Sequence, residues 1–236
     1  KIYPSGVVKV DARFTSADMQ VAESEVSEAT RTATFTPGND AARKAAAKLN
    51  VPRIGVRFRL PAEMNVVEYF GRGPEENYID RNAGTLIGLY KTTADKMYYN
   101  YVRPQENGHH TDTRWLSLSK KGGKGLTIVA DSIIGFNALR NSIEDFDSEE
   151  ALPHPRQWNN FSPEEIANHD EEAARNVLRR MHHVNDITPR DFVEVCVDMK
   201  QQGVAGYNSW GARPEPGYTI PANQEYNWGF TLIPDK

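Results

Sequence analysis

Several pairs of adjacent acidic residues have the side chains that sugar hydrolysis requires. The pairs are Glu75–Glu76, Glu149–Glu150, Glu164–Glu165 and Glu171–Glu172. Acid–base hydrolysis of a glycoside needs two carboxylates about 5–10 Å apart across the scissile bond. Neighbours in sequence point in different directions on a strand or a helix, so adjacency predicts no such pair. We interpret these residues as parts of solvated loops and helix faces, and we assign no catalytic residue to the chain.

The histidines have metal-ligating side chains but not the spacing of a metal site. They occur as His109–His110, His182–His183, His154 and His169. Metal ligands converge on one ion, typically from positions separated by two or more residues. We therefore predict no metal site, although a site built by histidines from distant strands stays open.

Segment 71–81, GRGPEENYIDR, concentrates polar groups beside aromatic residues. Its glycines and proline predict a turn. It is not a phosphate-binding loop, because no Lys-Ser/Thr follows and no helix begins there. We interpret it as a rigid loop in which Asp80 and Arg81 bind backbone groups and each other, as such side chains commonly do in turns.

Segment 103–115, RPQENGHHTDTRW, contains the best candidates for a polar cleft. Asn107-Gly108 is a turn signal. Glu106, Asn107, His109 and Arg114 are our candidate cleft residues, with His110 beside them. The alternative is an ordinary loop at the end of a strand.

The four tryptophans differ in their sequence surroundings. Trp115 and Trp228 lie in strand patterns and are expected in the core, whereas Trp210 lies in VAGYNSWGARPEPGYTIPA (204–222), a stretch rich in turn formers. Surface loops usually lack large apolar rings. An indole can stack on the apolar face of a sugar ring, so Trp210 is our candidate for saccharide binding.

Most of the remaining sequence has the alternation of half-buried strands. Strands are expected at 6–15, 53–60, 65–71, 97–102, 113–119, 125–131, 133–140, 191–200 and 226–234. In 53–60 the pattern places the aliphatic and aromatic residues inward and Arg53, Arg57 and Arg59 outward. The lysine- and glycine-rich stretch KKGGKG (120–125) predicts a hairpin turn between two of these strands. Short strands without a βαβ rhythm predict an antiparallel sandwich.

Helical patterns are few and short. They occur at 40–49, 142–146 and 161–181, where Ser162, Pro163 and Glu165 form a typical helix start. Residues 16–50 and 147–180 are expected to be insertions into the sandwich.

Composition narrows the possible partners of the chain. The net charge is −4 over 236 residues, which gives no indication of a nucleic-acid partner. No apolar run approaches the ~20 residues that span a bilayer. The single cysteine, Cys196, excludes an internal disulfide and is expected to be a small buried apolar residue.

The motifs GRGPEENYIDR and YVRPQENGHHTDTRWL, preceded by Val51-Pro52-Arg53-Ile54-Gly55 and followed by Asn208-Ser209-Trp210, occur in a familiar order. The chain resembles the C-terminal domain (small chain, domain 5) of the large bacterial β-galactosidases of glycoside hydrolase family 2. The resemblance covers residues 1–236 apart from the two insertions. It implies one galactose mutarotase-like β-supersandwich, cut from a longer enzyme and lacking its first strands.

The resemblance also implies that catalysis is carried out by another domain of the enzyme. The catalytic glutamates of the family, and the Mg²⁺ and Na⁺ it commonly uses, belong to a separate TIM-barrel domain, so this chain alone should be inactive and hold no cofactor. The parent would be a homo-oligomeric retaining enzyme that hydrolyses β-galactosides such as lactose. Trp210 matches a loop residue that helps to form the floor of the galactose site. Asp80, Arg81, Glu106, Asn107 and Arg114 match family positions without a catalytic task.

Two other functions stay open from the sequence. A stand-alone aldose 1-epimerase would need an acid and a base within reach of the sugar, for which Glu106 with His109 or His110 is the available set. A carbohydrate-binding module would bind sugar without catalysis; from one ring and no visible polar shell we expect weak binding. The natural glycoside, the oligomeric state and the cellular compartment are left open.

Overall fold

The computed structural model describes residues 1–15, 50–102, 105–146, 184, 187–206, 213–222 and 224–235. Nearly all of the two expected insertions lies outside these ranges, as do the helices expected at 40–49 and 161–181. Trp210 lies outside them as well.

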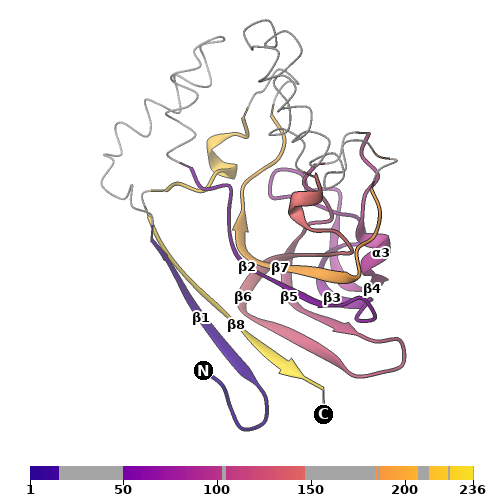
Figure 1. Cartoon of the computed structure of the whole chain (residues 1–236). Helices are drawn as coiled ribbons and strands as arrows, with labels where there is room; N and C mark the ends of the chain where they lie inside the picture. The colour runs from indigo at the N-terminus through magenta and orange to yellow at the C-terminus, as the bar shows by residue number, and fades with distance from the viewer. Residues whose placement is uncertain are drawn as a thin grey trace, which may run out of the picture.

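The described residues form one antiparallel sheet with a few helical turns around it (Figure 1). Its strands are β1 (Val8–Thr15), β2 (Arg53–Pro61), β3 (Val66–Gly73), β4 (Leu86–Thr93), β5 (His110–Ser119), β6 (Gly125–Leu139), β7 (Phe192–Gln201) and β8 (Glu225–Pro234). The helical elements are α3 (Ala94–Met97) and the 3-10 turns η1 (Ile143–Phe146) and η4 (Pro216–Tyr218). The expected all-β antiparallel class is confirmed. Among the described residues, no helix is both long enough and apolar enough to cross a membrane.

Strand β6 divides the sheet into two branches. Its first half pairs with β8, which β1 extends, and its second half pairs with β7, which β2 extends. Both halves pair on the other edge with β5, followed by β3 and β4. In Figure 1, β1 and β8 accordingly splay away from β2 and β7. The two strands expected at 125–131 and 133–140 are therefore one strand.

The core lies between these branches and follows the predicted alternation. Apolar core residues alternate along the central strands, as Leu116 and Leu118 do on β5 and Val193, Val195 and Val197 do on β7. Trp228 packs beside Phe230 at the margin of the core and is half-buried rather than enclosed. Trp115 is also half-buried.

The turn expected at 120–125 connects β5 to β6. Gly122 lies there with a φ of +67°, a conformation that residues with a side chain rarely adopt. The Lys120–Lys124 cluster is therefore a hairpin turn, as the sequence predicted.

The strand expected at 97–102 is wrong. Met97 ends α3, and residues 98–102 have no strand partner among the described residues. The Asn107 side chain bonds both backbone groups of Tyr99, accepting from its N–H at 2.7 Å and donating to its carbonyl at 2.6 Å. One amide side chain thus satisfies the backbone where the aromatic-rich pattern predicted a neighbouring strand.

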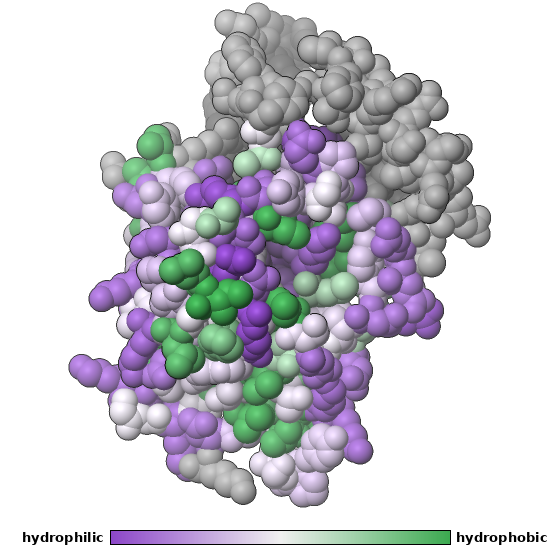
Figure 2. All heavy atoms as spheres, turned by 180° about the vertical axis from the view of Figure 1, so that it is seen from behind, coloured by the Kyte–Doolittle hydropathy of each residue, from purple (hydrophilic) through white to green (hydrophobic). Residues whose placement is uncertain are grey.

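Strand β4 lies at an edge of the sheet and was not predicted. Leu86 and Leu89 on it are 74% and 72% exposed, so the apolar residues of its sequence do not mark a buried face. From behind, hydrophobic residues form several small patches separated by hydrophilic ones (Figure 2). Such scattered exposure is ordinary for a protein surface.

Candidate functional site

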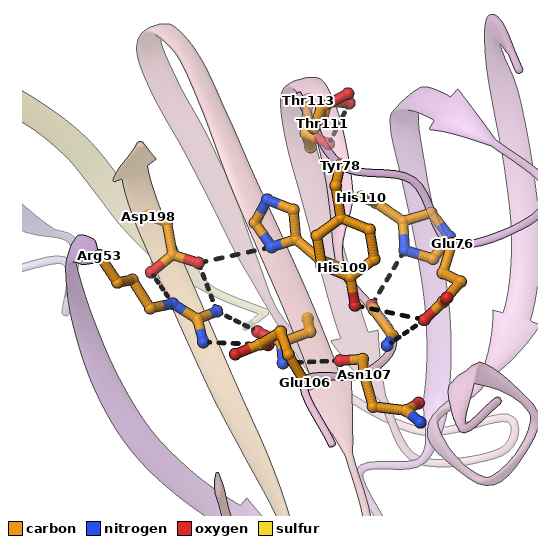
Figure 3. A network of polar contacts seen from close by, with 12 residues as sticks. Arg53, Glu76, Tyr78, Glu106, Asn107, His109, His110, Thr111, Thr113 and Asp198 are labelled. Carbon is orange, nitrogen blue, oxygen red and sulfur yellow. Dashed lines mark hydrogen bonds and ion pairs between the residues drawn. The ribbon is translucent and has the colours of Figure 1, made fainter. Parts of the chain in front are cut away.

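The side chain of Arg53 is the centre of a polar network on the face of β2 and β7 that lies opposite the core (Figure 3). It donates two bonds to Asp198, at 2.8 and 2.6 Å, and one to Asn137 Oδ1 at 2.6 Å. It also bonds Glu106 at 3.4 Å. Arg53 lies on the outward face of β2, as expected, but the exposure expected there is wrong, because this side chain is only 16% exposed. Arg57 and Arg59, at 42% and 52%, are exposed as expected.

The charges of this network compensate one another. Burial lowers the pKa of Arg53, but the Asp198 charge and hydrogen bonds more than reverse this, so the net pKa is raised. Burial raises the pKa of Asp198, and the Arg53 guanidinium opposes that shift. A buried charge is tolerated only with such a partner. The pair is therefore a structural element that positions Glu106 and Asn137.

Both candidate histidines are buried and uncharged at neutral pH. His109 stacks on Tyr78, with its Nδ1 3.7 Å from Asp198 Oδ2. The ring nitrogens of His110 lie 3.1 Å from the Gly108 carbonyl and 3.2 Å from the Pro74 carbonyl. Burial lowers the pKa of both rings, and the Arg53 charge lowers that of His109 further, whereas the Pro74 and Gly108 carbonyls partly oppose the shift at His110. Neither ring is therefore a ready proton donor for an epimerase.

Segments 71–81 and 105–114 form one rigid unit around Glu76 and Asn77. Glu76 accepts bonds from Arg81 and from the Gly108 N–H, both at 2.7 Å, and also from Tyr101. Asn77 is fully buried and bonds the backbone of both segments. The expectation that Asp80 bonds a backbone group is confirmed, but the Arg81 side chain bonds the side chains of Glu76 and Tyr101 rather than Asp80 or the backbone.

Asp80 instead ties this unit to the base of the Trp210 loop. Its Oδ2 accepts the Ala205 N–H at 2.7 Å. Two residues earlier, the Gly203 N–H donates to the Tyr218 carbonyl, which lies beyond the loop, also at 2.7 Å. Both flanks of residues 207–212 are thereby fastened to described parts of the fold.

A pocket of about 230 Å³ opens beside Arg53, on the same face of the sheet. Its lining consists of Glu106, Asn107, Asn137, Leu139, Asn141, Ile143, Phe146, Glu194 and Cys196. Cys196 is a buried free thiol, as expected. Burial raises its pKa to about 12.

The four candidate cleft residues are divided between different surroundings. Glu106 and Asn107 line the 230 Å³ pocket, whereas His109 lines a separate hollow of about 110 Å³. Arg114 lies over the Phe70 ring and donates to the Asp112 carbonyl. The structure therefore does not bring Glu106 and His109 together in one cavity as an acid–base pair. In the described ranges, no three His, Cys, Asp or Glu side chains converge as metal ligands.

Asn137, Asn141 and Glu194 were not predicted as site residues. They come from β6, the segment after it, and β7, and strand pairing rather than a local motif brings them to the pocket. The one signal in the sequence that could have indicated these residues was the polar face of the predicted strands. The strand expected at 191–200 already placed Glu194 on that face.

Comparison with known proteins shows that the chain is similar to part of several β-galactosidases. The beta galactosidase small chain family matches residues 1–232. A β-galactosidase of Priestia megaterium is 33% identical over 184 residues, which is 78% of this chain and 15% of that protein. One from Arthrobacter sp. (strain B7) is 40% identical over 124 residues, covering 50% of this chain and 12% of that protein.

A third relative, the β-galactosidase of Streptococcus thermophilus, is 26% identical over 186 residues, covering 78% of this chain and 15% of that protein. The chain thus spans about 15% of the length of the Priestia megaterium and Streptococcus thermophilus relatives. Its sequence match, extending over nearly all 236 residues, shows that the chain belongs to the beta galactosidase small chain family.

Proposed function

We propose that this chain is an accessory domain of a retaining β-galactosidase that hydrolyses terminal β-galactosides such as lactose. The observation that carries this proposal is the family match over residues 1–232, together with relatives of whose length the matched part covers only about 15%. The catalytic carboxylates, the TIM barrel, and its Mg²⁺ and Na⁺ would belong to the rest of the polypeptide. The parent would be a homo-oligomer, and this chain alone would be inactive.

The proposed contribution of this domain is Trp210, carried to the galactose site by the 207–212 loop. The anchoring of both loop flanks supports this role, because an aromatic ring contributes most to binding when its position is fixed in advance. The bond from the Ala205 N–H to Asp80 lies on one flank, and the bond from the Gly203 N–H to Tyr218 links both sides of the loop.

Trp210→Ala in the intact parent is expected to raise KM for a β-galactoside about ten- to a hundredfold, in the range of an aromatic binding residue. Steady-state kinetics would measure the change, and circular dichroism would check the fold. Tyr3→Ala, at a distant aromatic residue that is 38% exposed, is the matched control. Unchanged KM and kcat in the Trp210 variant would remove this residue from the site.

Asp80→Ala is expected to have a smaller effect of the same kind. It removes a charge-assisted bond to the Ala205 N–H, so the loop becomes less well positioned and KM should rise about three- to tenfold. Asp11→Ala, at a carboxylate that is 77% exposed, should leave KM unchanged. Equal KM values for the two variants would show that Asp80 does not position the loop.

A further inference from the structure

The 230 Å³ pocket has a floor built by two neighbouring strands. Asn137 pairs with Cys196 across β6 and β7, and Leu139 pairs with Glu194, so these four side chains share one face of the sheet. The walls are residues 106–107 on one side and 141–146 on the other. The opposite face of the same strands is packed in the core through Ala138, Val193 and Val195.

The polar groups of the pocket retain capacity for a ligand. Glu194 is 3% exposed, and it accepts one bond from the Ile143 N–H at 3.1 Å and one from Arg59 at 2.9 Å. A carboxylate can accept about four hydrogen bonds. The Asn137 NH₂ group donates to the Asn107 carbonyl and the Asn141 NH₂ group to the Thr188 carbonyl. Each NH₂ group carries a second N–H. Acceptors and donors thus surround the same space.

The charge of the pocket argues against an ionic ligand. Glu194 is paired with Arg59 and lies 3.5 Å from Arg57, and Glu106 is paired with Arg53. The carboxylates line the pocket, which disfavours an anion, and their arginine partners already compensate the charge that would attract a cation. An uncharged ligand with several hydroxyl groups fits this balance best.

The size and the apolar lining of the pocket specify the ligand further. Leu139, Ile143 and Phe146 provide an apolar surface for the C–H face of a ring. The Phe146 ring is held by stacking on Tyr98, with centroids 6.0 Å apart. The volume is below the ~300 Å³ at which ligand pockets usually begin, so one sugar ring fits better than two. We infer that the pocket formed by β6, β7, residues 106–107 and residues 141–146 binds an uncharged monosaccharide.

This inference does not depend on the role proposed for Trp210. The experiment titrates the 236-residue chain with D-galactose and with D-glucose, and with inorganic phosphate as the charged comparison, using saturation-transfer NMR and calorimetry. At least one of the sugars should bind saturably, with a Kd of about 1–10 mM as expected for a small polar ligand. Phosphate should not bind.

Ile143→Trp would fill the pocket from its rim, where Ile143 is 36% exposed, and should raise the Kd for the sugar at least tenfold. Ile233→Trp introduces the same ring at an isoleucine that is 38% exposed and does not line the pocket, and should leave the Kd unchanged. Glu106→Gln, a milder change at a half-buried wall residue, should raise the Kd several-fold. Thermal unfolding of every variant checks that each remains folded.

Trp210→Ala separates this inference from the proposed function and should leave the Kd unchanged. Absence of saturable binding by both sugars would overturn the inference. A second result would also overturn it: sugar binding that is abolished by Trp210→Ala and unchanged in Ile143→Trp and Glu106→Gln. The sugar would then be bound by the Trp210 loop.

Discussion

Asp198→Ala is expected to lower the free energy of unfolding by about 3–5 kcal/mol, the usual cost of removing one partner of a buried ion pair. Asp198 is 1% exposed and accepts two bonds from Arg53, whose side chain is 16% exposed. Without the carboxylate, the guanidinium remains in a largely dry environment with Asn137 and Glu106 as its other partners. Urea unfolding at pH 7 would measure the change.

Two further variants separate lost pairing from lost packing. Arg53→Met/Asp198→Leu removes both charges and should be more stable than Asp198→Ala, because replacing a whole buried pair by apolar groups is often nearly neutral. Glu63→Ala breaks a pair with Lys120 in which both side chains are more than half exposed, and should cause little change. If Asp198→Ala were as stable as Glu63→Ala, Arg53 would not depend on this carboxylate.

Strand positions could largely be predicted because alternation is a local property. The predicted strands at 53–60, 191–200 and 226–234 coincide with β2, β7 and β8 to within one or two residues. The pattern at 97–102 was equally suggestive but was overridden by Asn107, which bonds the backbone of Tyr99. No local pattern reveals that an amide eight residues away takes the place of a strand.

Arg53 shows the limit of alternation for predicting a site. The pattern correctly assigned it to the polar side of β2, but it could not reveal that this side is covered. A register shift between Ile54 and Gly55 and the pairing of β2 with β7 bring Asp198 to Arg53. The sequence therefore predicted Glu106 and Asn107 as cleft residues from a short motif, but not Asn137 or Glu194, which reach the same pocket through strand pairing.

The second large effect is expected with acid. His109 and His110 are each 2% exposed, and burial lowers the pKa of both rings below the ordinary value of 6.5. Below about pH 6.5 the unfolded chain takes up protons that the folded chain does not. Stability should therefore fall as the pH falls from 6.5 towards the folded-state pKa values, and these histidines should contribute no pH dependence above 6.5. The slope should approach about 1.4 kcal/mol per pH unit for each ring.

Several carboxylates act on these rings or titrate nearby, so the pH range of the measurement matters. The charges of Glu75 and Glu76 oppose the shift at His110. Asp198 affects the pH dependence of stability in the direction opposite to the histidines. Its pKa is raised in the folded state, so it binds a proton that the unfolded chain does not, and this adds stability as the pH falls. Glu63, Glu144 and Glu225 have lowered pKa values, and their contributions are lost only below about pH 4.5. Measurements between pH 7.5 and 5 therefore avoid these three glutamates, and the histidine variants separate the contribution of the two rings from that of Asp198.

Urea unfolding across that range should give a shallower pH dependence for His109→Gln and His110→Gln than for the unsubstituted chain, and the shallowest for the double variant. Each substitution also removes packing, on Tyr78 for His109 and on Tyr69 and Phe136 for His110. The diagnostic quantity is therefore the slope of stability against pH rather than stability at one pH. If the slope were the same with and without the two rings, they would not be held in their neutral form by burial.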